Sequence, residues 1–522
     1  MRRSTPAAIC VFLLATACLT RAAAPFEGEP ARPDTEIDRL VFARLRALGI
    51  PPPRLCSDAV FVRRAYLDVI GTLPTEDEAR AFLLDRSPRK RAALIDHLLE
   101  RPEFADYQAM KWGDLLRVKA EFPINLWPNA VQAYHRWIRE AMRQNMPYDR
   151  FARELLTSSG SNFRMPPVNF MRAVQSKTPQ GLAAAAALTF MGVRAEKWPP
   201  ERLEAMAVFF SCVGYKPTTE WKEEIVFFDF TKAAALPHTV ILPDGSTAAL
   251  DRRRDPRQVF ADWLISPSNP WFARNIVNRI WSWLLGRGII HEPDDIRPDN
   301  PPVNPELLEY LQRELIRSGW DLKHIFRLIL NSRTYQFSCI PPPGRHPAAE
   351  ANFAYYPLRR LDAEVLIDAV CQITGTTEKY SSPIPEPFTF MPDNQRSIAL
   401  PDGSVGSAFL ELFGRPPRDT GLEAERNNRP TAGQWLHMLN STHIQRKIEQ
   451  SEKLRALARD SRMRPRQLID RLYLTILSRF PEEEEMRAAL RQLGSGGLLG
   501  ARDAWVDIAW ALMNTMEFQY RH

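Results

Sequence analysis

The densest group of residues that could do chemistry is the segment HEPDDIRPDN at residues 291–300. It offers one imidazole and three carboxylates from His291, Asp294, Asp295 and Asp299. Oxygen-rich loops suit Ca²⁺ or Mg²⁺, and a histidine beside carboxylates can hold a transition metal. The spacing matches no standard metal loop, so the acids could instead pair with arginines and cap helices. The sequence therefore allows a divalent-cation or catalytic site and, as the alternative, a structural role.

A second group combines tryptophans with amides and an arginine, mostly on one predicted helix. An aromatic ring can stack on a sugar while amide and guanidinium groups hydrogen-bond its hydroxyls. The predicted ligand-binding residues are Trp271, Asn275, Asn278, Arg279, Trp127 and Trp137. Packing in the core with satisfied polar groups is the competing interpretation.

Motifs that define common enzyme classes are missing from the sequence. We find no Gly-x-Ser-x-Gly elbow, no phosphate loop and no dinucleotide fingerprint. His437 and His443 are six residues apart, and on one helix this spacing would place them on different faces. The sequence therefore leans against an enzyme, with no cofactor expected and a divalent cation allowed.

The size and composition describe a globular protein of more than one domain. A chain of 522 residues exceeds what one hydrophobic core usually supports, and its 45% hydrophobic and 25% charged residues are ordinary. Removing the first 24 residues takes away three arginines and no acid, so the net charge falls from +7 to +4. This weak charge gives no reason to expect nucleic acid as a partner.

The N-terminal segment predicts export. Residues 1–24 combine Arg2 and Arg3, an apolar stretch and small residues before Pro25, as a secretory signal peptide does. We expect a periplasmic or cell-surface location, with a lipid anchor at Cys18 as the less favoured alternative. No later apolar run is long enough to span a membrane. Four cysteines follow the signal, and whether they pair stays open: Cys56, Cys212, Cys339 and Cys371.

The elements that must position these residues are mostly helices. Thr75 with Glu78 forms a capping box, and Asn304-Pro305 is a further helix start. Strand signals are limited to residues 225–230 and to two copies of LPDGS, at 242–246 and 400–404, each of which predicts a small hairpin. We therefore predict a mainly α, multi-helical, two-domain protein with a few short β-hairpins.

An internal repeat joins the two ends of the chain. Residues 64–83 and 471–490 match without a gap at Tyr66/Tyr473, Pro74/Pro481 and other positions. Duplication of one helical hairpin explains the match better than two unrelated helix–Pro–helix units. We place the domain boundary near residues 231–250, which gives an N-terminal domain at 25–235 and a C-terminal domain at 236–522.

Long motifs in the sequence resemble a known pair of families. FVRRAYLDVIGTLPTEDEARAFL, RPEFADYQAMKWGDLLR and ALTFMGVR are similar to the planctomycete-type domain of unknown function 1549. DPRQVFADWLISPSNPWFARNIVNRIWSWLLGRGII and DLKHIFRLILNSRTYQFS resemble its companion, domain of unknown function 1553. The resemblance implies an exported, cytochrome-associated protein of unassigned activity.

This chain departs from the resemblance at two places. Many relatives carry a Cys-x-x-Cys-His-like segment after GVR, but here RAEKWPPERLEAM contains no cysteine or histidine. Relatives often show a Cys-x-Cys before the Glu-Arg of DTGLEAER, where this chain has Leu422 and Ala424. We therefore expect a member without haem.

The leading functional interpretation is a haem-free binding or assembly module that acts outside the cytoplasm on a polysaccharide or another exported protein. One alternative is a metal-dependent enzyme that uses the 291–299 loop. Another is an accessory protein of a redox chain, which follows from the family association alone.

Overall fold

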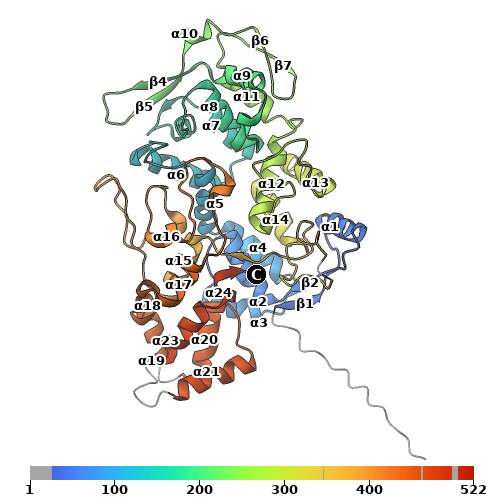
Figure 1. Ribbon diagram of the computed structural model, residues 1–522, viewed down its shortest axis with the longest axis vertical. Coiled ribbons are helices and arrows are strands. Elements are labelled where there is room, and N and C mark those ends of the chain that lie inside the picture. The colour runs from blue at the N-terminus through green and yellow to red at the C-terminus, as the bar shows by residue number, and fades with distance from the viewer. Residues whose placement is uncertain (1–25, 345, 460–462, 496–503) are drawn as a thin grey trace, which may run out of the picture.

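The computed structural model describes residues 26–344, 346–459, 463–495 and 504–522, so the predicted signal peptide lies outside it. The described chain is mainly helical (Figure 1), which confirms the predicted fold class. The helices are α1 (Glu36–Ala47), α2 (Asp58–Val69), α3 (Glu76–Leu84), α4 (Lys90–Glu100), α5 (Pro102–Leu115), α6 (Pro128–Arg143), α7 (Tyr148–Thr157), α8 (Pro179–Ala186), α9 (Pro200–Ala207), α10 (Phe230–Ala233), α11 (Pro256–Leu264), α12 (Phe272–Leu285), α13 (Pro305–Arg317), α14 (Leu322–Asn331), α15 (Ala363–Thr374), α16 (Ala408–Leu412), α17 (Ala432–Asn440), α18 (Thr442–Glu449), α19 (Glu452–Arg459), α20 (Pro465–Leu477), α21 (Glu483–Ser495), α23 (Ala504–Met513) and α24 (Met516–Gln519).

The described chain also contains short antiparallel strands, in three two-stranded sheets and one three-stranded sheet. They are β1 (Glu27–Pro30) with β2 (Arg54–Cys56), β3 (Gly160–Ser161) and β4 (Val213–Pro217) on either side of β5 (Glu224–Phe228), β6 (Thr239–Ile241) with β7 (Thr247–Ala249), and β8 (Arg359–Arg360) with β9 (Tyr520–Arg521). The first LPDGS copy closes the β6–β7 hairpin as predicted, and residues 225–230 contribute most of β5.

The second LPDGS copy is not a hairpin, and this part of the sequence prediction is wrong. Residues Ser397–Ala399 before it form a 3₁₀ turn, because the Asp368 carboxylate accepts the backbone N–H groups of Ser397 and Ile398 at 2.8 and 3.1 Å. Asp402 of the copy accepts the N–H of Ala120 at 2.9 Å. Contacts with distant segments therefore replace the strand pairing that the turn sequence favours.

Two hydrophobic clusters form the core. The larger one takes in α1 to α14 and the hairpins around them. The smaller one collects residues of 361–518 together with four side chains from the N-terminal part, namely Leu67, Leu73, Tyr107 and Met110. In Figure 1 the helices from α18 to α23 lie at one end of the long axis and β4 to β7 at the other, with α5 and α12 between them. The boundary near residues 231–250 stays a prediction.

The helix starts follow from local sequence. Thr75 and Glu78 form the expected capping box of α3, and the Asn304 side chain accepts the N–H of Leu307 at the start of α13. Both contacts satisfy N–H groups that have no partner inside the helix. Gly286 ends α12 in the left-handed conformation, with φ of 74°.

The two repeat units are helical hairpins that pack against each other. The first is α2 and α3, the second is α20 and α21, and α20 packs on α3. Arg471 forms an ion pair with Glu76 at 2.7 Å across this contact. The sequence does not tell whether the two copies of the repeat pack together, and the structure shows that they do. Their origin by duplication stays a prediction.

An arginine held between two glutamates lies at each unit. Arg101 pairs with Glu78 and Glu103 at 2.7 and 2.6 Å, and Arg479 pairs with Glu485 and Glu517 at 2.6 Å each. Glu78 and Glu485 occupy matching places in the two units, and Glu103 and Glu517 each belong to a Glu-Phe pair that follows a unit. The arginines do not occupy matching places, since Arg101 directly precedes α5 and Arg479 lies between α20 and α21. The same charge cluster is therefore built twice from different positions.

Within the described residues, no helix is long and apolar enough to cross a membrane. The four cysteines after the signal segment carry free thiols.

Candidate functional site

The asparagines and the arginine predicted on α12 form hydrogen bonds with backbone groups, two of them in a neighbouring π-helix. Beyond α8 the chain continues as a π-helix at Ala187–Met191, whose i→i+5 pattern disturbs the usual backbone pairing. Asn275 donates to the carbonyl of Thr189 at 2.9 Å, and Arg279 donates to that of Leu188 at 3.1 Å. Asn278 both donates to and accepts from the backbone of Ile290, at 3.0 and 2.9 Å.

Asn275, Asn278 and Arg279 are fully buried, so their polar atoms do not reach the surface. The other predicted ligand-binding residues lie elsewhere. Trp271 lies beside Trp263 with ring centroids 6.0 Å apart, and Trp137 stacks on Phe151 at 5.0 Å. The predicted set is therefore not one surface.

The acids of the 291–299 loop are occupied by arginines. Asp294 is buried and pairs with Arg279 at 2.6 Å, while Arg297 pairs with Asp295 at 3.0 Å and with Asp299 at 2.9 Å. His291 is exposed. No group of three or more His, Cys, Asp or Glu side chains that could hold a metal occurs in the part of the chain that the structure describes. The metal assignment for this loop stays a prediction.

Glycine at position 192 lets this loop approach the π-helix. Gly192 has φ of 65°, and a Cβ atom there would lie 2.8 Å from the carbonyl oxygen of Pro293 and 2.7 Å from Oδ1 of Asn275. We expect Gly192→Ala to cost about 1–3 kcal/mol more than Gly49→Ala, because Gly49 has a similar φ of 69° but open space around it. Denaturant unfolding of both variants measures the difference, and equal losses would show that the contact is unimportant.

The segment DTGLEAER joins the same region to the C-terminal cluster. Glu423 accepts hydrogen bonds from Trp283 Nε1 at 2.9 Å and from Arg279 at 3.4 Å, and its N–H donates to Asp294 at 2.6 Å. Burial raises the pKa of the Glu423 carboxyl. The 291–300 segment and the DTGLEAER segment, which are far apart in the sequence, are therefore parts of one buried network.

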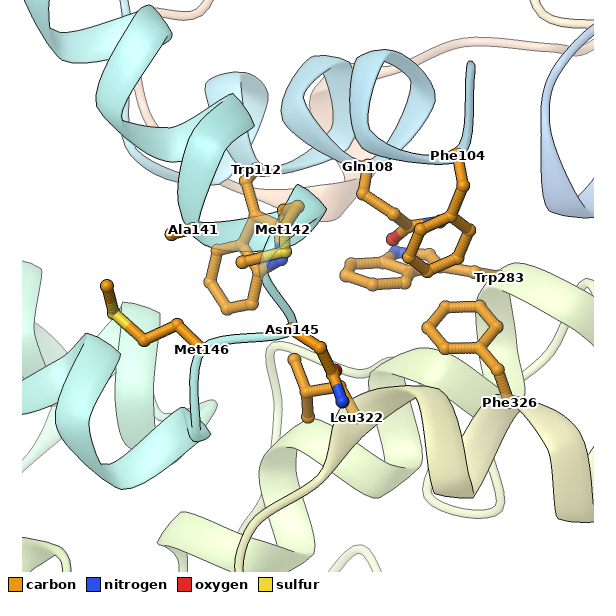
Figure 2. Close-up of a pocket in the computed structure, with 10 residues that line it drawn as sticks. All are labelled: Phe104, Gln108, Trp112, Ala141, Met142, Asn145, Met146, Trp283, Leu322 and Phe326. Carbon is orange, nitrogen blue, oxygen red and sulfur yellow. The ribbon is translucent and has the colours of Figure 1, made fainter. Parts of the chain in front are cut away.

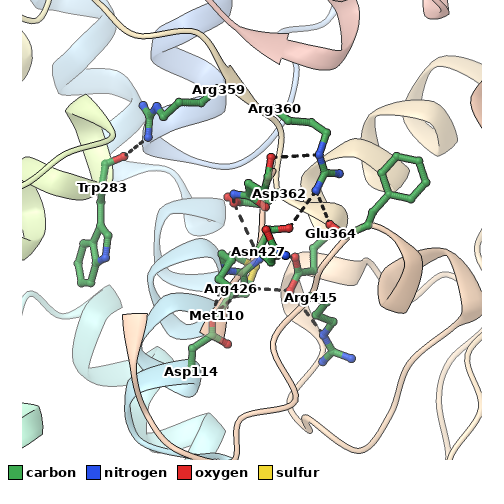
Figure 3. A network of polar contacts seen from close by, with 12 residues as sticks. Met110, Asp114, Trp283, Arg359, Arg360, Asp362, Glu364, Arg415, Arg426 and Asn427 are labelled. Carbon is green, nitrogen blue, oxygen red and sulfur yellow. Dashed lines mark hydrogen bonds and ion pairs between the residues drawn. The ribbon is translucent and has the colours of Figure 1, made fainter. Parts of the chain in front are cut away.

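Arg426 is the centre of a second buried network (Figure 3). It pairs with Asp114 of α5 and with Glu364 of α15, each at 2.7 Å, and lies 3.9 Å from Asp362. These carboxylates hold the pKa of Arg426 well above its ordinary value, even though burial alone would lower it. The charges are matched and enclosed, so the network connects segments and is not open to a ligand.

His437 and His443 lie next to each other, so the prediction of different faces is wrong. The helix ends at Asn440, and Ser441 turns the chain into α18, which brings His437 Nε2 to 3.4 Å from His443 Nδ1. His443 Nε2 contacts Glu378 at 2.9 Å. The six-residue spacing would separate the rings only on a continuous helix.

The small apolar cavity in Figure 2 is part of the core. Phe104, Gln108, Trp283 and Phe326 face it, and its volume is about 10 Å³. A space of this size suits about one water molecule. Gln108 Nε2 is buried there without a protein partner. The cavity could satisfy an amide but has no room for a substrate.

A much larger cleft, called the α8 cleft below, lies along α8. Its volume is about 600 Å³, and its walls come from Arg117, residues 174–188, residues 194–203 and residues 419–422. This volume is typical of small-molecule sites. Both segments at which the sequence departs from the family pattern line it, through Lys197 and Leu422. The two departures are therefore neighbours in space.

An exposed aromatic cluster forms between three distant segments. Trp127, Trp221 and Phe388 have ring centroids 4.7, 5.3 and 5.6 Å apart, and Nζ of Lys222 lies 5.0 Å from the Trp127 ring. Trp221 is 58% exposed and Phe388 is 40% exposed. The sequence predicted Trp127 as a ligand-binding residue, but it did not predict Trp221 or Phe388. The one signal for Trp221 was a lone tryptophan among polar residues in the β4–β5 turn.

The geometry defines a mainly helical protein with buried ionic networks, a large cleft along α8 and an exposed aromatic cluster. The family model described as protein of unknown function (DUF1549) matches residues 36–194, and the one described as protein of unknown function (DUF1553) matches residues 256–493. The chain belongs to the proteins that carry these two segments in this order, which confirms the resemblance. Both descriptions leave the activity unassigned. No curated protein and no solved structure matches the chain.

Proposed function

We propose that this protein is a haem-free binding module that acts outside the cytoplasm and recognises polysaccharide through the aromatic cluster. The exported location rests on the sequence of residues 1–24. The absence of haem rests on the missing Cys-x-x-Cys-His-like segment. The recognition itself rests on the exposed rings of Trp221 and Phe388 and the half-buried ring of Trp127.

The cluster is costly in water and is therefore a candidate for binding. Its rings come from the loop before α6, the β4–β5 turn and the α15–α16 connection, so three separate loops cooperate to expose it. Apolar surface in water is unfavourable by about 25 cal/mol per Å². One face of a sugar ring carries mainly C–H groups and can cover an aromatic ring, while its hydroxyls stay in water.

The size of the cluster favours a sugar over a protein partner. Three partly exposed rings offer on the order of 300 Å². A stable protein interface needs about 800 Å² on each partner. One or two sugar rings fit the smaller area, and many repeats of a polysaccharide can compensate for weak single contacts. Lys222 adds a positive charge beside the rings and suits a neutral or acidic polysaccharide.

We expect Trp221→Ala to weaken retention on the recognised polysaccharide by at least tenfold, because stacking on that ring is lost. The measurement is a pull-down of the mature chain on a panel of insoluble polysaccharides, followed by affinity electrophoresis on the one that binds. Trp435→Ala is the matched control, since Trp435 is 50% exposed on α17, outside the cluster. Retention that is unchanged in Trp221→Ala, or no retention of the unmodified chain, would contradict the proposal.

A further inference from the structure

Arg117 is a buried cation without an ion pair at the wall of the α8 cleft. The residue is 3% exposed and lies two positions beyond the end of α5, with φ of 55°. Its Nε donates to the carbonyl of Ala173, but its Nη2 is buried without a partner among the described residues. No carboxylate of the described chain lies within ion-pair distance of it. Burial lowers the pKa of Arg117 to about 10, so the group remains charged at neutral pH.

Other buried arginines of the described chain have more partners than Arg117, although Nε of Arg63 and Nη2 of Arg64 are also without one. Arg64 donates to the carbonyls of His522, Tyr335 and Phe337. Arg426 is held by two carboxylates at 2.7 Å. A buried charge is normally paired or fully hydrogen-bonded, because its desolvation is otherwise unfavourable. Arg117, with one carbonyl partner and no carboxylate, is therefore the least compensated of these arginines, and its free donors belong to a residue that lines a cleft.

The charges around the cleft favour an anion. Arg194 and Lys197 also line it, and Nε of Arg194 is buried without a partner. The acids of the lining are Glu196 and Asp419, and Asp419 is already paired with Lys119 at 2.6 Å. Arg194 is likewise paired with Glu292 at 3.1 Å, so the basic groups left without an acid partner are Arg117 and Lys197, which face Glu196.

One more carboxyl lies behind the lining. Glu425 accepts the N–H groups of Asp419 and Thr420 at 3.1 and 3.2 Å, and burial raises its pKa. Its other oxygen has no partner in the described chain. The Glu425 carboxyl contributes to the electrostatic potential at Arg117 without forming an ion pair with that residue.

We propose that the α8 cleft binds an organic molecule through an oxyanion, a carboxylate or a sulfate, held by the guanidinium of Arg117 and assisted by Lys197. A guanidinium presents parallel N–H groups that match two oxygens of such an anion. Ala184, Leu188, Leu203 and Leu422 supply an apolar wall for the body of the ligand. The site uses none of the aromatic-cluster residues, so it is independent of the proposed polysaccharide surface.

The test is titration of the mature chain with sodium glucuronate, sodium sulfate and glucose, followed by calorimetry and by the melting temperature. We expect saturable binding of glucuronate or sulfate and none of glucose. Tighter binding of glucuronate identifies an organic carboxylate as the preferred group, and tighter binding of sulfate identifies a sulfate ester. Absence of saturable binding for both anions would overturn the proposal.

Variants separate the site from general charge effects. Arg117→Met should abolish anion binding without lowering stability in anion-free buffer, because no partner carboxylate is left behind. Lys197→Glu should weaken binding at least fivefold, whereas Lys379→Glu, the same charge change on an exposed loop between α15 and α16, should not. Trp221→Ala should bind the anion normally. Binding that survives in Arg117→Met, or that falls equally in the two lysine variants, would refute the assignment.

Discussion

Replacing Arg426 by methionine is expected to lower the free energy of unfolding by about 3–5 kcal/mol. The change removes the partner that Asp114 and Glu364 share, and leaves Asp114 with Arg418 at 2.9 Å and the fully enclosed Glu364 with Arg415 at 3.5 Å. The loss comes mainly from these under-compensated buried carboxylates and not from the lost attraction itself. Denaturant unfolding followed by circular dichroism measures it.

Two further variants make this expectation specific. Glu364→Gln in the Arg426→Met background removes one under-compensated buried charge, so the double variant should be less destabilised than the sum of the single variants by at least about 1 kcal/mol. Arg143→Met is the control, since Arg143 is 54% exposed in its pair with Glu140 and its loss should not be measurable. A stability of Arg426→Met within about 1 kcal/mol of the unmodified chain would be inconsistent with the network in Figure 3.

Acid should destabilise this protein well above the pH at which its carboxylates titrate. Burial lowers the pKa of His135 to about 3, and Arg418 and Arg139 act in the same direction. In the unfolded chain this histidine titrates near its ordinary value of about 6.5. Between these values the unfolded state binds the proton and the folded state does not, so stability falls as the pH falls. By pH 4.5 the loss from this one residue is about 2–3 kcal/mol.

His135→Phe should flatten the fall in stability between pH 6.5 and 4.5, because the remaining ring cannot be protonated. His522, whose pKa is also lowered to about 3 by burial, continues to act in the same direction, so part of the slope remains. Unfolding curves at pH 7.5, 6.0 and 4.5 test this, with His97→Phe at an exposed position as the control. An identical slope in His135→Phe and the unmodified chain would disprove the role of this histidine.

Local sequence predicted those features whose cause lies within a few residues. The capping box of Thr75 and the helix start at Asn304 need only neighbouring backbone groups, and both are present in the structure. The two LPDGS copies show the limit of such reasoning. They have the same turn chemistry, but Asp402 of the second copy is engaged by Ala120, which is 282 residues away.

The candidate sites depend on long-range contacts and were only partly predictable. Trp127 was recognised from its aromatic–polar surroundings, but its partners Trp221 and Phe388 lie on other segments. Arg117 carries no sequence signal, since only the fold shows that its Nη2 has no partner among the described residues. Asn275 and Arg279 have the composition of a sugar site, and the structure uses them on the backbone of the π-helix.

The pairing of β8 with β9 has a consequence for how the chain can reach its final state. Arg63 donates to the carbonyl of Phe518, and Arg64 donates to that of His522, which is 458 residues later in the chain. Until residues 518–522 are docked, Arg63 and Arg64 in the middle of α2 each lack one of the carbonyl acceptors that their burial requires. Docking of residues 518–522 therefore completes the core around α2, and a variant in which they cannot dock is expected to expose this part of the core to proteases.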